Sequence, residues 1–418
     1  MKPFITSIKL ALFVLIIFRC TNQTCAEDSN TIPPMKVLWQ KEITADANMD
    51  CSLGPVVFDK TNKKLLIAGT SFRPRVYSEG KLWLLEVDTN NSNINRTIHI
   101  SDINESRAAA PITLAVSLIS GLMVSENNDV TLVGKFDNTT SPISIVKVTR
   151  SINASKLIKL ASKNNSINDF PHINGGISLP GDNLLLMGGG KDGGSVTMVG
   201  SKGDRLWNKR YKIGQGRIEF FNNGLAVGDK NEIAIVGCSA NVKGKFPDVA
   251  GEDFILLCSV QGDVIAKDIF SGSPDPGELP EVCQLSSGNF VVVFCKSKST
   301  AMPKSDVNIR TYSPDLKLLW EKSVVKSAEN KPSSFKIAAV PKNGFVVAAD
   351  VDFGNLRVYE YDEKGNMVAT FSRDKEVWSV NIGLVCMDKK AFVVFQTRPD
   401  MGQSNKISKI KIVALELK

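Results

Sequence analysis

The sequence predicts an all-β chain of repeated four-stranded units, and three observations lead to that prediction. A tryptophan followed two residues later by lysine recurs in near-identical surroundings at Trp39, Trp207 and Trp320. These tryptophans are 168 and 113 residues apart, which fits three and two copies of a unit of about 56 residues. Short apolar runs also alternate with turn clusters from residue 35 onwards, almost without helical periodicity. We therefore expect a seven-bladed β-propeller.

The clearest unit is 224–269, which contains four apolar runs separated by turn clusters and one long loop. Four antiparallel strands are the content of one propeller blade. The same order recurs in five other segments, 54–100, 121–160, 176–211, 283–324 and 338–371.

The two ends of the chain are expected to share the seventh blade. Residues 383–387, 391–396 and 409–415 supply three strands without a fourth, and residues 35–43, with Trp39, form a strand with no blade before it. Joining them closes the ring and removes unpaired sheet edges. The prediction is therefore a single domain over 35–418.

The N-terminus reads as a secretory leader. Two lysines precede an apolar run at 10–18, and small residues follow at 24–26. We expect a signal peptide over 1–26, cleaved near Ala26, then a short linker over 27–34, in a secreted or periplasmic protein. A retained transmembrane anchor would need about 20 apolar residues, so no transmembrane segment is expected. A lipid anchor on Cys20 or Cys25 remains an alternative.

Composition is ordinary for a globular chain, with 43% hydrophobic and 22% charged residues among 418. The net charge of +8 would fall to +5 on removal of Lys2, Lys9 and Arg19 with the leader. That mild excess does not indicate nucleic-acid binding. We expect a monomer.

Two segments carry a resemblance to a known class of repeat. Residues 188–196 and 203–211, the second with Trp207 and Lys209, resemble the repeats of exported β-propellers of the quinoprotein-like, SBBP and delta-60 kinds. Residues 237–263 are similar, although Ala266 stands where the pattern has tryptophan. The resemblance implies a fold and no particular activity.

Acidic residues precede several of the predicted innermost strands, where a propeller has the mouth of its channel. They are Asp50, Glu219, Glu278 or Glu281, and Glu376. Such carboxylates can hold a cation such as Ca²⁺ or act as an acid–base pair. The alternative is that they bond to backbone groups as part of the repeat.

Basic residues gather in the loops between the second and third strands, on the same face as the channel mouth. They are Arg73, Arg75, Lys243, Lys245, Lys296, Lys298, Lys304, Arg398 and Lys406. A basic rim attracts anionic partners, whereas solvated loop charge is the alternative. As ligand-binding residues we single out Arg73, Arg75, Lys243, Lys245, Trp378, Glu219 and Glu281.

Six cysteines remain after leader cleavage, an even number that indicates disulfides in an exported chain. The hypothesis pairs Cys283 with Cys295 across a hairpin, Cys238 with Cys258 across a loop, and Cys51 with Cys386 near the closure. The alternative is six buried thiols. With no Cys-x-x-Cys pair and only His99 and His172, the sequence indicates no zinc site, no histidine relay and no cofactor.

These features favour an exported, non-catalytic binding or scaffolding module whose partner is a protein or an anionic glycan. The alternative is a hydrolase or lyase that acts on a polysaccharide with carboxylates at the channel mouth. Sialidase boxes are absent, and tryptophan occupies the repeated position in only three units, too few for a quinone-dependent dehydrogenase.

Six Asn-x-Ser/Thr sequons lie between residues 90 and 166. They start at Asn90, Asn95, Asn104, Asn138, Asn153 and Asn164. They would accept glycans in a eukaryotic secretory pathway and would arise by chance in an asparagine-rich bacterial chain.

Overall fold

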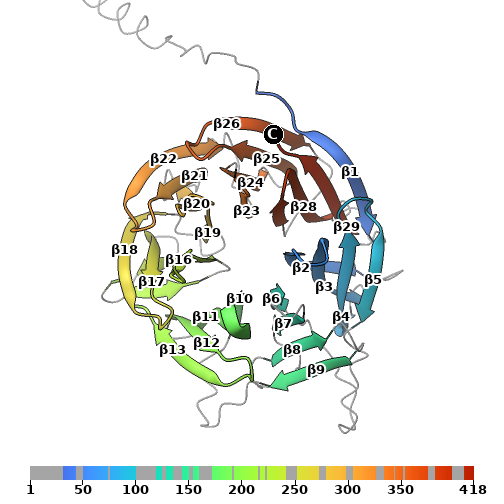
Figure 1. Ribbon diagram of the computed structural model, residues 1–418, viewed down its shortest axis with the longest axis horizontal. Helices are drawn as coiled ribbons and strands as arrows, with labels where there is room; N and C mark the ends of the chain where they lie inside the picture. Colours follow the sequence, from blue (N-terminus) through green and yellow to red (C-terminus); the bar gives the residue numbers. More distant parts are fainter. Residues whose placement is uncertain are drawn as a thin grey trace, which may run out of the picture.

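The computed structural model shows an all-β protein whose antiparallel sheets are arranged in a ring around a common axis (Figure 1). The structure describes residues 32–43, 50–73, 76–99, 119–124, 129–134, 144–149, 154–159, 172–190, 193–214, 217–221, 224–241, 252–272, 279–297, 305–325, 334–342, 344–351, 354–374, 382–397 and 409–418. The predicted leader over 1–26 lies outside these residues. Within the described ranges, no helix has the length and apolar character that a membrane crossing needs.

The described strands group into seven sheets, which we number as blades in chain order. Blade I consists of β2 (Asp50–Asp59), β3 (Lys64–Arg73), β4 (Val76–Asp88) and β5 (Ile94–His99). Blade II consists of β6 (Ile119–Val124), β7 (Val130–Gly134), β8 (Ser144–Thr149) and β9 (Ala154–Lys159). Blade III consists of β10 (His172–Leu179), β11 (Asn183–Gly190), β12 (Gly193–Val199) and β13 (Arg205–Arg210), with a 3₁₀ turn at Pro180–Asp182.

In blade IV the innermost strand is split into β14 (Arg217–Phe220) and β15 (Leu225–Val227), which both pair with β16 (Ile233–Asn241). Blade IV continues with β17 (Glu252–Cys258) and β18 (Val264–Ser271). Blade V consists of β19 (Glu281–Gln284), β20 (Phe290–Ser297), β21 (Ser305–Tyr312) and β22 (Leu318–Val325). Blade VI consists of β23 (Ser334–Val340), β24 (Gly344–Val351), β25 (Asn355–Tyr361) and β26 (Met367–Arg373).

Blade VII joins the two ends of the chain. Its strand order is β1-β29-β28-β27, with β1 (Lys36–Ile43), β27 (Ile382–Met387), β28 (Lys390–Thr397) and β29 (Lys409–Glu416). Strand β1 pairs antiparallel with β29, so the N-terminal strand lies in one sheet with the C-terminal three, as the sequence predicts. The innermost strands contact one another around the ring, in the order β2, β6, β10, β15, β19, β23 and β27, and β27 contacts β2.

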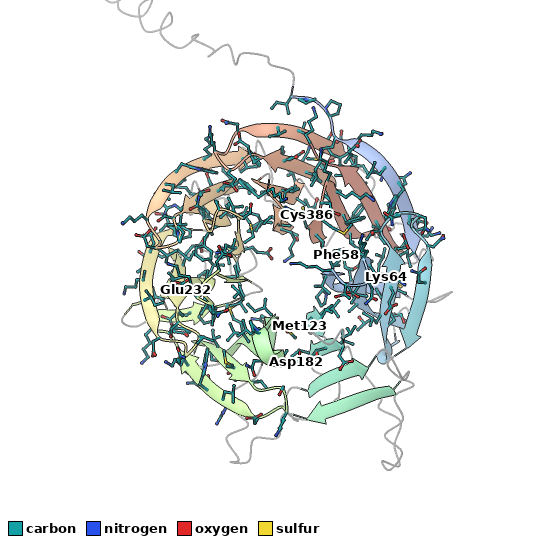
Figure 2. All side chains as sticks on the ribbon, viewed as in Figure 1. Phe58, Lys64, Met123, Asp182, Glu232 and Cys386 are labelled. Carbon is teal, nitrogen blue, oxygen red and sulfur yellow. The ribbon has the colours of Figure 1, made fainter. Side chains whose placement is uncertain are left out.

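The core lies between the blades. A middle strand is covered on both faces by neighbouring blades, so its sequence is a continuous apolar run, as in β24, where all residues are buried. The outermost strand has one face toward the next blade and one toward solvent, so β18 alternates between partly buried and exposed residues. Side chains fill the space between the blades (Figure 2).

The three repeated tryptophans each reach from an outermost strand to a hairpin of the next blade. The Trp207 Nε1–H donates to the Val260 carbonyl at 3.1 Å, and the Trp39 Nε1–H donates to the Thr89 carbonyl at 3.3 Å. The ring of Trp320 packs against Gly365. The repeated tryptophan therefore fixes an outermost strand to the adjacent hairpin of the next blade.

Strand register corrects the predicted disulfides, since none of the six cysteines from Cys51 to Cys386 is in a disulfide. Cys283 lies opposite Val291, so Cys295 is four residues further along its strand, about 13 Å away. Cys258 lies opposite Ile233 and Cys238 opposite Asp253, a larger offset. Disulfides need Cα atoms within about 7 Å.

The third predicted pair also stays unformed. Cys51 is near the start of β2, whereas Cys386 is near the end of β27, a neighbouring inner strand that runs the same way. The two residues also belong to different hydrophobic clusters. The alternative interpretation, buried thiols, agrees with the burial of Cys51, Cys238, Cys258 and Cys295.

Candidate functional site

The two ends of the ring differ in how the strands are connected. We call the turn end the one where strand one joins strand two and strand three joins strand four within a blade. Tight hairpins close it, and their backbones bond internally. The Gly203 N–H donates to the Gly200 carbonyl at 2.8 Å, and the Gly262 N–H donates to the Ser259 carbonyl at 2.8 Å. These glycines have φ values of +87° and +78°, the left-handed region that these hairpins require.

The opposite end, which we call the loop end, is where strand two joins strand three and where successive blades are joined. It carries the longest connections of the chain, which run over 100–118, 160–171, 242–251 and 398–408. The first and last described segments, at Met35 and Leu417, lie at the turn end. The Met35 N–H donates to the Thr370 carbonyl at 2.8 Å, and the Leu417 N–H donates to the Lys389 carbonyl at 2.8 Å. Functional residues commonly lie on loops held by a rigid scaffold.

Glu219 lies on β14, at the loop end of the innermost strand of blade IV. Its side chain is buried, with 4% exposed. The Oε1 atom accepts a hydrogen bond of 2.9 Å from the backbone N–H of Ile213, which lies on the connection from blade III. This carboxylate therefore fixes an inter-blade connection.

Glu281 begins β19, the innermost strand of blade V, and forms an ion pair with Lys336 on β23 of blade VI. Burial raises the pKa of Glu281 above its usual range, although the Lys336 ammonium and the backbone N–H of Ile337 oppose that shift. Removal of either partner would leave the other side chain at the blade interface without its counter-charge, which is strongly destabilising for a buried pair. Sequence reasoning singled out Glu281 but missed Lys336.

Most other predicted ligand-binding residues fall outside the described side chains. Arg73 ends β3 at the loop end, and its backbone pairs with Val76. The positions of Arg75, Lys243, Lys245 and Trp378 lie outside the described residues. Of the other carboxylates, Asp50 begins β2, whereas Glu278 and Glu376 lie outside the described residues.

One residue of the predicted basic rim has an acidic partner. Lys296 Nζ is 3.3 Å from Glu321 Oε1, so part of its charge is neutralised within blade V.

Between blades IV and V lies a charge network that the sequence did not reveal. Arg310 on β21 donates from Nε to Glu321 Oε2 at 2.8 Å and from Nη1 to Asp268 Oδ2 at 3.2 Å. Its guanidinium also lies 4.5 Å from the ring centroid of Phe270. The sequence repeat does not predict this network, because its bonds join residues on different strands of two blades.

The described residues hold no cluster of three or more His, Cys, Asp or Glu side chains that could bind a metal ion. Within the described residues, the structure is therefore a ring in which Glu219 and Glu281 have structural partners and whose loop end carries the longest connections.

Comparisons with known proteins agree on architecture. No protein-family model matches the chain, and no curated protein matches it. A protein of unknown function from Dyadobacter fermentans superposes with a TM-score of 0.53 at 9% identity, over 93% of this chain and all of that one. Drosophila Plexin A in complex with Semaphorin 1b superposes with a TM-score of 0.51 at 10% identity, over 93% of this chain and 88% of that one.

A polysaccharide lyase of family PL25, an ulvan lyase, gives a TM-score of 0.53 at 7% identity, over 90% of this chain and 96% of the lyase. The likeness shows a β-propeller fold. At such low identity it shows the fold alone, and the particular repeat family that the sequence resembles is not among these matches.

Proposed function

We propose that this protein is exported and acts as a non-catalytic binding or scaffolding module through its loop end. One observation carries the proposal, the contrast between the two ends of the ring. Hairpins with internal backbone bonds close the turn end, where Met35 and Leu417 also lie. The loop end carries the longest connections, and those between strands two and three hold Arg75, Lys243, Lys245, Lys298, Lys304, Arg398 and Lys406. A ring of this kind is a rigid frame from which one set of loops meets a partner.

The partner is a protein or an anionic glycan. Arg73, Arg75, Lys243 and Lys245 belong to the loop end, and their positive charge attracts carboxylate, sulfate or phosphate groups. Trp378 comes just before β27 in the sequence, and its indole is the proposed surface for stacking on a sugar ring or a planar side chain. We propose that the protein acts as a monomer and needs no cofactor.

The alternative, a polysaccharide hydrolase or lyase, would use Glu219 and Glu281 as acid and base. Their observed bonds do not favour it. The Glu219 carboxylate accepts the Ile213 N–H, and the Glu281 carboxylate pairs with Lys336, so both contribute to blade packing. The structural likeness to an ulvan lyase concerns the fold and adds no residue to that alternative.

The experiment uses the chain from residue 27, immobilised through its C-terminus at the turn end, and probes it with acidic and neutral polysaccharides. We expect acidic glycans to bind and binding to weaken with added salt, because the attraction is between exposed charges. The triple variant R73A/K243A/K245A should lose binding.

A matched control removes the same charge from the turn end. Lys60, Lys202 and Lys230 are exposed there, so K60A/K202A/K230A should bind as the wild type does. Equal loss in both triple variants would contradict a loop-end site. New reducing ends that disappear in Glu281→Gln or Glu219→Gln would favour the enzyme instead, and no retained glycan would leave a protein as the partner.

A further inference from the structure

The outermost strands of six blades share a β-bulge at one position. In each, one extra residue lies outside the regular pairing, directly before the position of the repeated tryptophan. The bulged residues are Leu38, Asn95, Leu206, Ile265, Leu319 and Val368. Five are aliphatic, and Leu206, Ile265 and Leu319 are 50%, 58% and 51% exposed. Blade I alone among these six has a polar residue at the position.

That polar residue, Asn95, begins the sequon Asn95-Arg96-Thr97. On β5, Ile94 pairs with Val87 and Arg96 with Glu86, so Asn95 is the unpaired residue of the bulge. The side chains of Asn95 and Thr97 are both exposed. Strand β5 lies on the outer perimeter of the ring (Figure 1). The acceptor amide and the hydroxyl of this sequon are therefore both at the surface, on a residue that the sheet does not pair.

A second sequon, Asn90-Asn91-Ser92, lies five residues earlier in the hairpin that leads into β5. Asn90 is exposed, and its backbone N–H donates to Asp88 Oδ1 at 2.8 Å. Its Oδ1 atom accepts a bond of 3.0 Å from Lys390 Nζ of blade VII. That bond uses the amide oxygen, whereas an N-linked glycan is attached to the amide nitrogen.

The distribution of sequons along the chain is uneven. Residues 27–171 and 172–418 each contain 15 asparagines, yet all six sequons of residues 27–418 lie in the first range and none in the second. The first range corresponds to blades I and II, and the second to blades III to VII without β1. The exposed aliphatic bulge residues have the opposite distribution, because Leu206, Ile265 and Leu319 belong to blades III, IV and V.

We propose that Asn90 and Asn95 are N-glycosylation sites, which place oligosaccharide on the perimeter and turn end of blade I. The proposal rests on the export proposed above. A glycan on Asn95 shields the outer edge of β5, a strand edge that could otherwise pair with another chain. A glycan on Asn90 projects from the turn end, so both modifications leave the loop end open to a partner.

The first test is mass spectrometry of the mature protein from the organism that makes it. Release of N-glycans by an amidase converts the acceptor asparagine to aspartate. We expect that conversion at Asn90 and Asn95 and not at Asn91, which is exposed in the same hairpin without a sequon of its own. Unmodified Asn90 and Asn95 in the secreted protein would overturn the proposal.

The second test separates acceptor geometry from export. In a eukaryotic secretory host, Thr97→Ala should remove one glycan step from the electrophoretic mobility, whereas the conservative Thr97→Ser keeps the sequon and should retain it. The pair Ser92→Ala and Ser92→Thr makes the same comparison for Asn90.

Each variant is expressed with its own leader and with a foreign one. Glycans with the foreign leader only would sink the export proposal and, with it, modification in the native cell. No glycans with either leader would refute the acceptor sites themselves.

Discussion

Trp207 and its neighbours show how single residues of the repeat hold two blades together. The indole N–H donates to the Val260 carbonyl, and two residues later Lys209 forms an ion pair with Asp263 of the same hairpin. In blade V, Lys322 Nζ donates to the Gly365 carbonyl at 2.9 Å, on the hairpin where the Trp320 ring packs. The Trp-x-Lys spacing therefore encodes a two-point contact with the next blade.

The cysteines give a prediction at the residue scale. Burial raises the pKa of the Cys258 thiol to about 11, so at neutral pH this thiol is protonated as well as inaccessible. Burial also raises the pKa of Cys283 and Cys386 above the usual thiol range. We expect a thiol reagent at pH 7 to label the folded protein from residue 27 slowly and all six cysteines quickly once it is unfolded without reductant. Thiols that appear only after reduction would mean that disulfides exist.

Glu321 gives a pH-dependent prediction. Burial by itself would raise its pKa, but the bonds from Arg310 and the charge of Lys296 outweigh burial and hold the pKa below the usual value of 4.5. Because the folded-state pKa is the lower one, this carboxylate stabilises the fold fully above the unfolded-state pKa, and the effect is lost as pH falls from there through the folded-state pKa. The urea midpoint of Glu321→Gln should be lower than that of the wild type at pH 7, and the gap should close toward about pH 3.

An exposed ion pair is the control for that pH series. Glu416 pairs with Lys36 at 3.2 Å, but both side chains are largely exposed, so Glu416→Gln should change the midpoint little at any pH. A gap for Glu321→Gln that stays constant from pH 7 to pH 3 would contradict the electrostatic origin.

At the scale of elements, the contact between an outermost strand and the next hairpin comes in two forms. Where the strand has Trp320, the hairpin has Gly365 with φ of +76°, and a Cβ there would lie 2.7 Å from the indole ring. Where the strand of blade IV has Ala266, the hairpin of blade V has Leu316, 8% exposed and also at positive φ. The large side chain is on one element or the other, and the space between blades stays filled.

Exchanging the two forms tests this complementarity. Trp320→Ala should lower the free energy of unfolding by about 2 kcal/mol because it opens a cavity between blades. Gly365→Leu should also destabilise, because its side chain meets the indole. In the double variant the leucine occupies the space of the indole. The loss of unfolding free energy in the double variant should therefore be smaller than the sum of the two single losses, by about 1 kcal/mol or more. Equilibrium urea unfolding measures all three.

A mismatched pair is the control for this cycle. Trp207 contacts Gly262 and not Gly365, so Trp207→Ala combined with Gly365→Leu should show additive losses. Additivity in both cycles would mean that the strand and the hairpin do not share one space.

At the scale of the whole molecule, the ring depends on a strand supplied by the other end of the chain. Strand β1 covers β29, and Trp39 reaches the Thr89 carbonyl of blade I. The Arg373 Nη1–H of blade VI also donates to Gln40 Oε1 at 3.1 Å. Blade VII therefore touches both neighbours through a segment that lies more than 300 residues from its partner strand.

Deleting residues 35–43 should abolish cooperative unfolding, since it exposes the edge of β29 and removes the contacts with blades I and VI. Deleting nine residues from the longest connection, between β5 and β6, 106–114, still leaves ten residues to join the strands and should give a soluble protein that unfolds cooperatively, because the length of a long loop costs little free energy. Thermal unfolding followed by circular dichroism compares them. If the 35–43 variant folds as stably as the loop variant, β1 does not hold the ring. If it fails to fold, a peptide of residues 32–43 should restore the structure when added.

The sequence by itself determined the strands, their grouping in fours and the union of the N-terminal strand with the C-terminal three. These features follow from patterns among residues that are close together in the sequence. The patterns are the apolar alternation, the turn glycines and the Trp-x-Lys repeat. Only the tertiary structure decided which side chains meet. Trp207 is 53 residues from Val260, and Glu281 is 55 from Lys336. Register likewise placed Cys283 opposite Val291 and separated the predicted disulfide partners. Such contacts cross between blades, where their geometry depends on the packing of whole sheets and not on any local pattern.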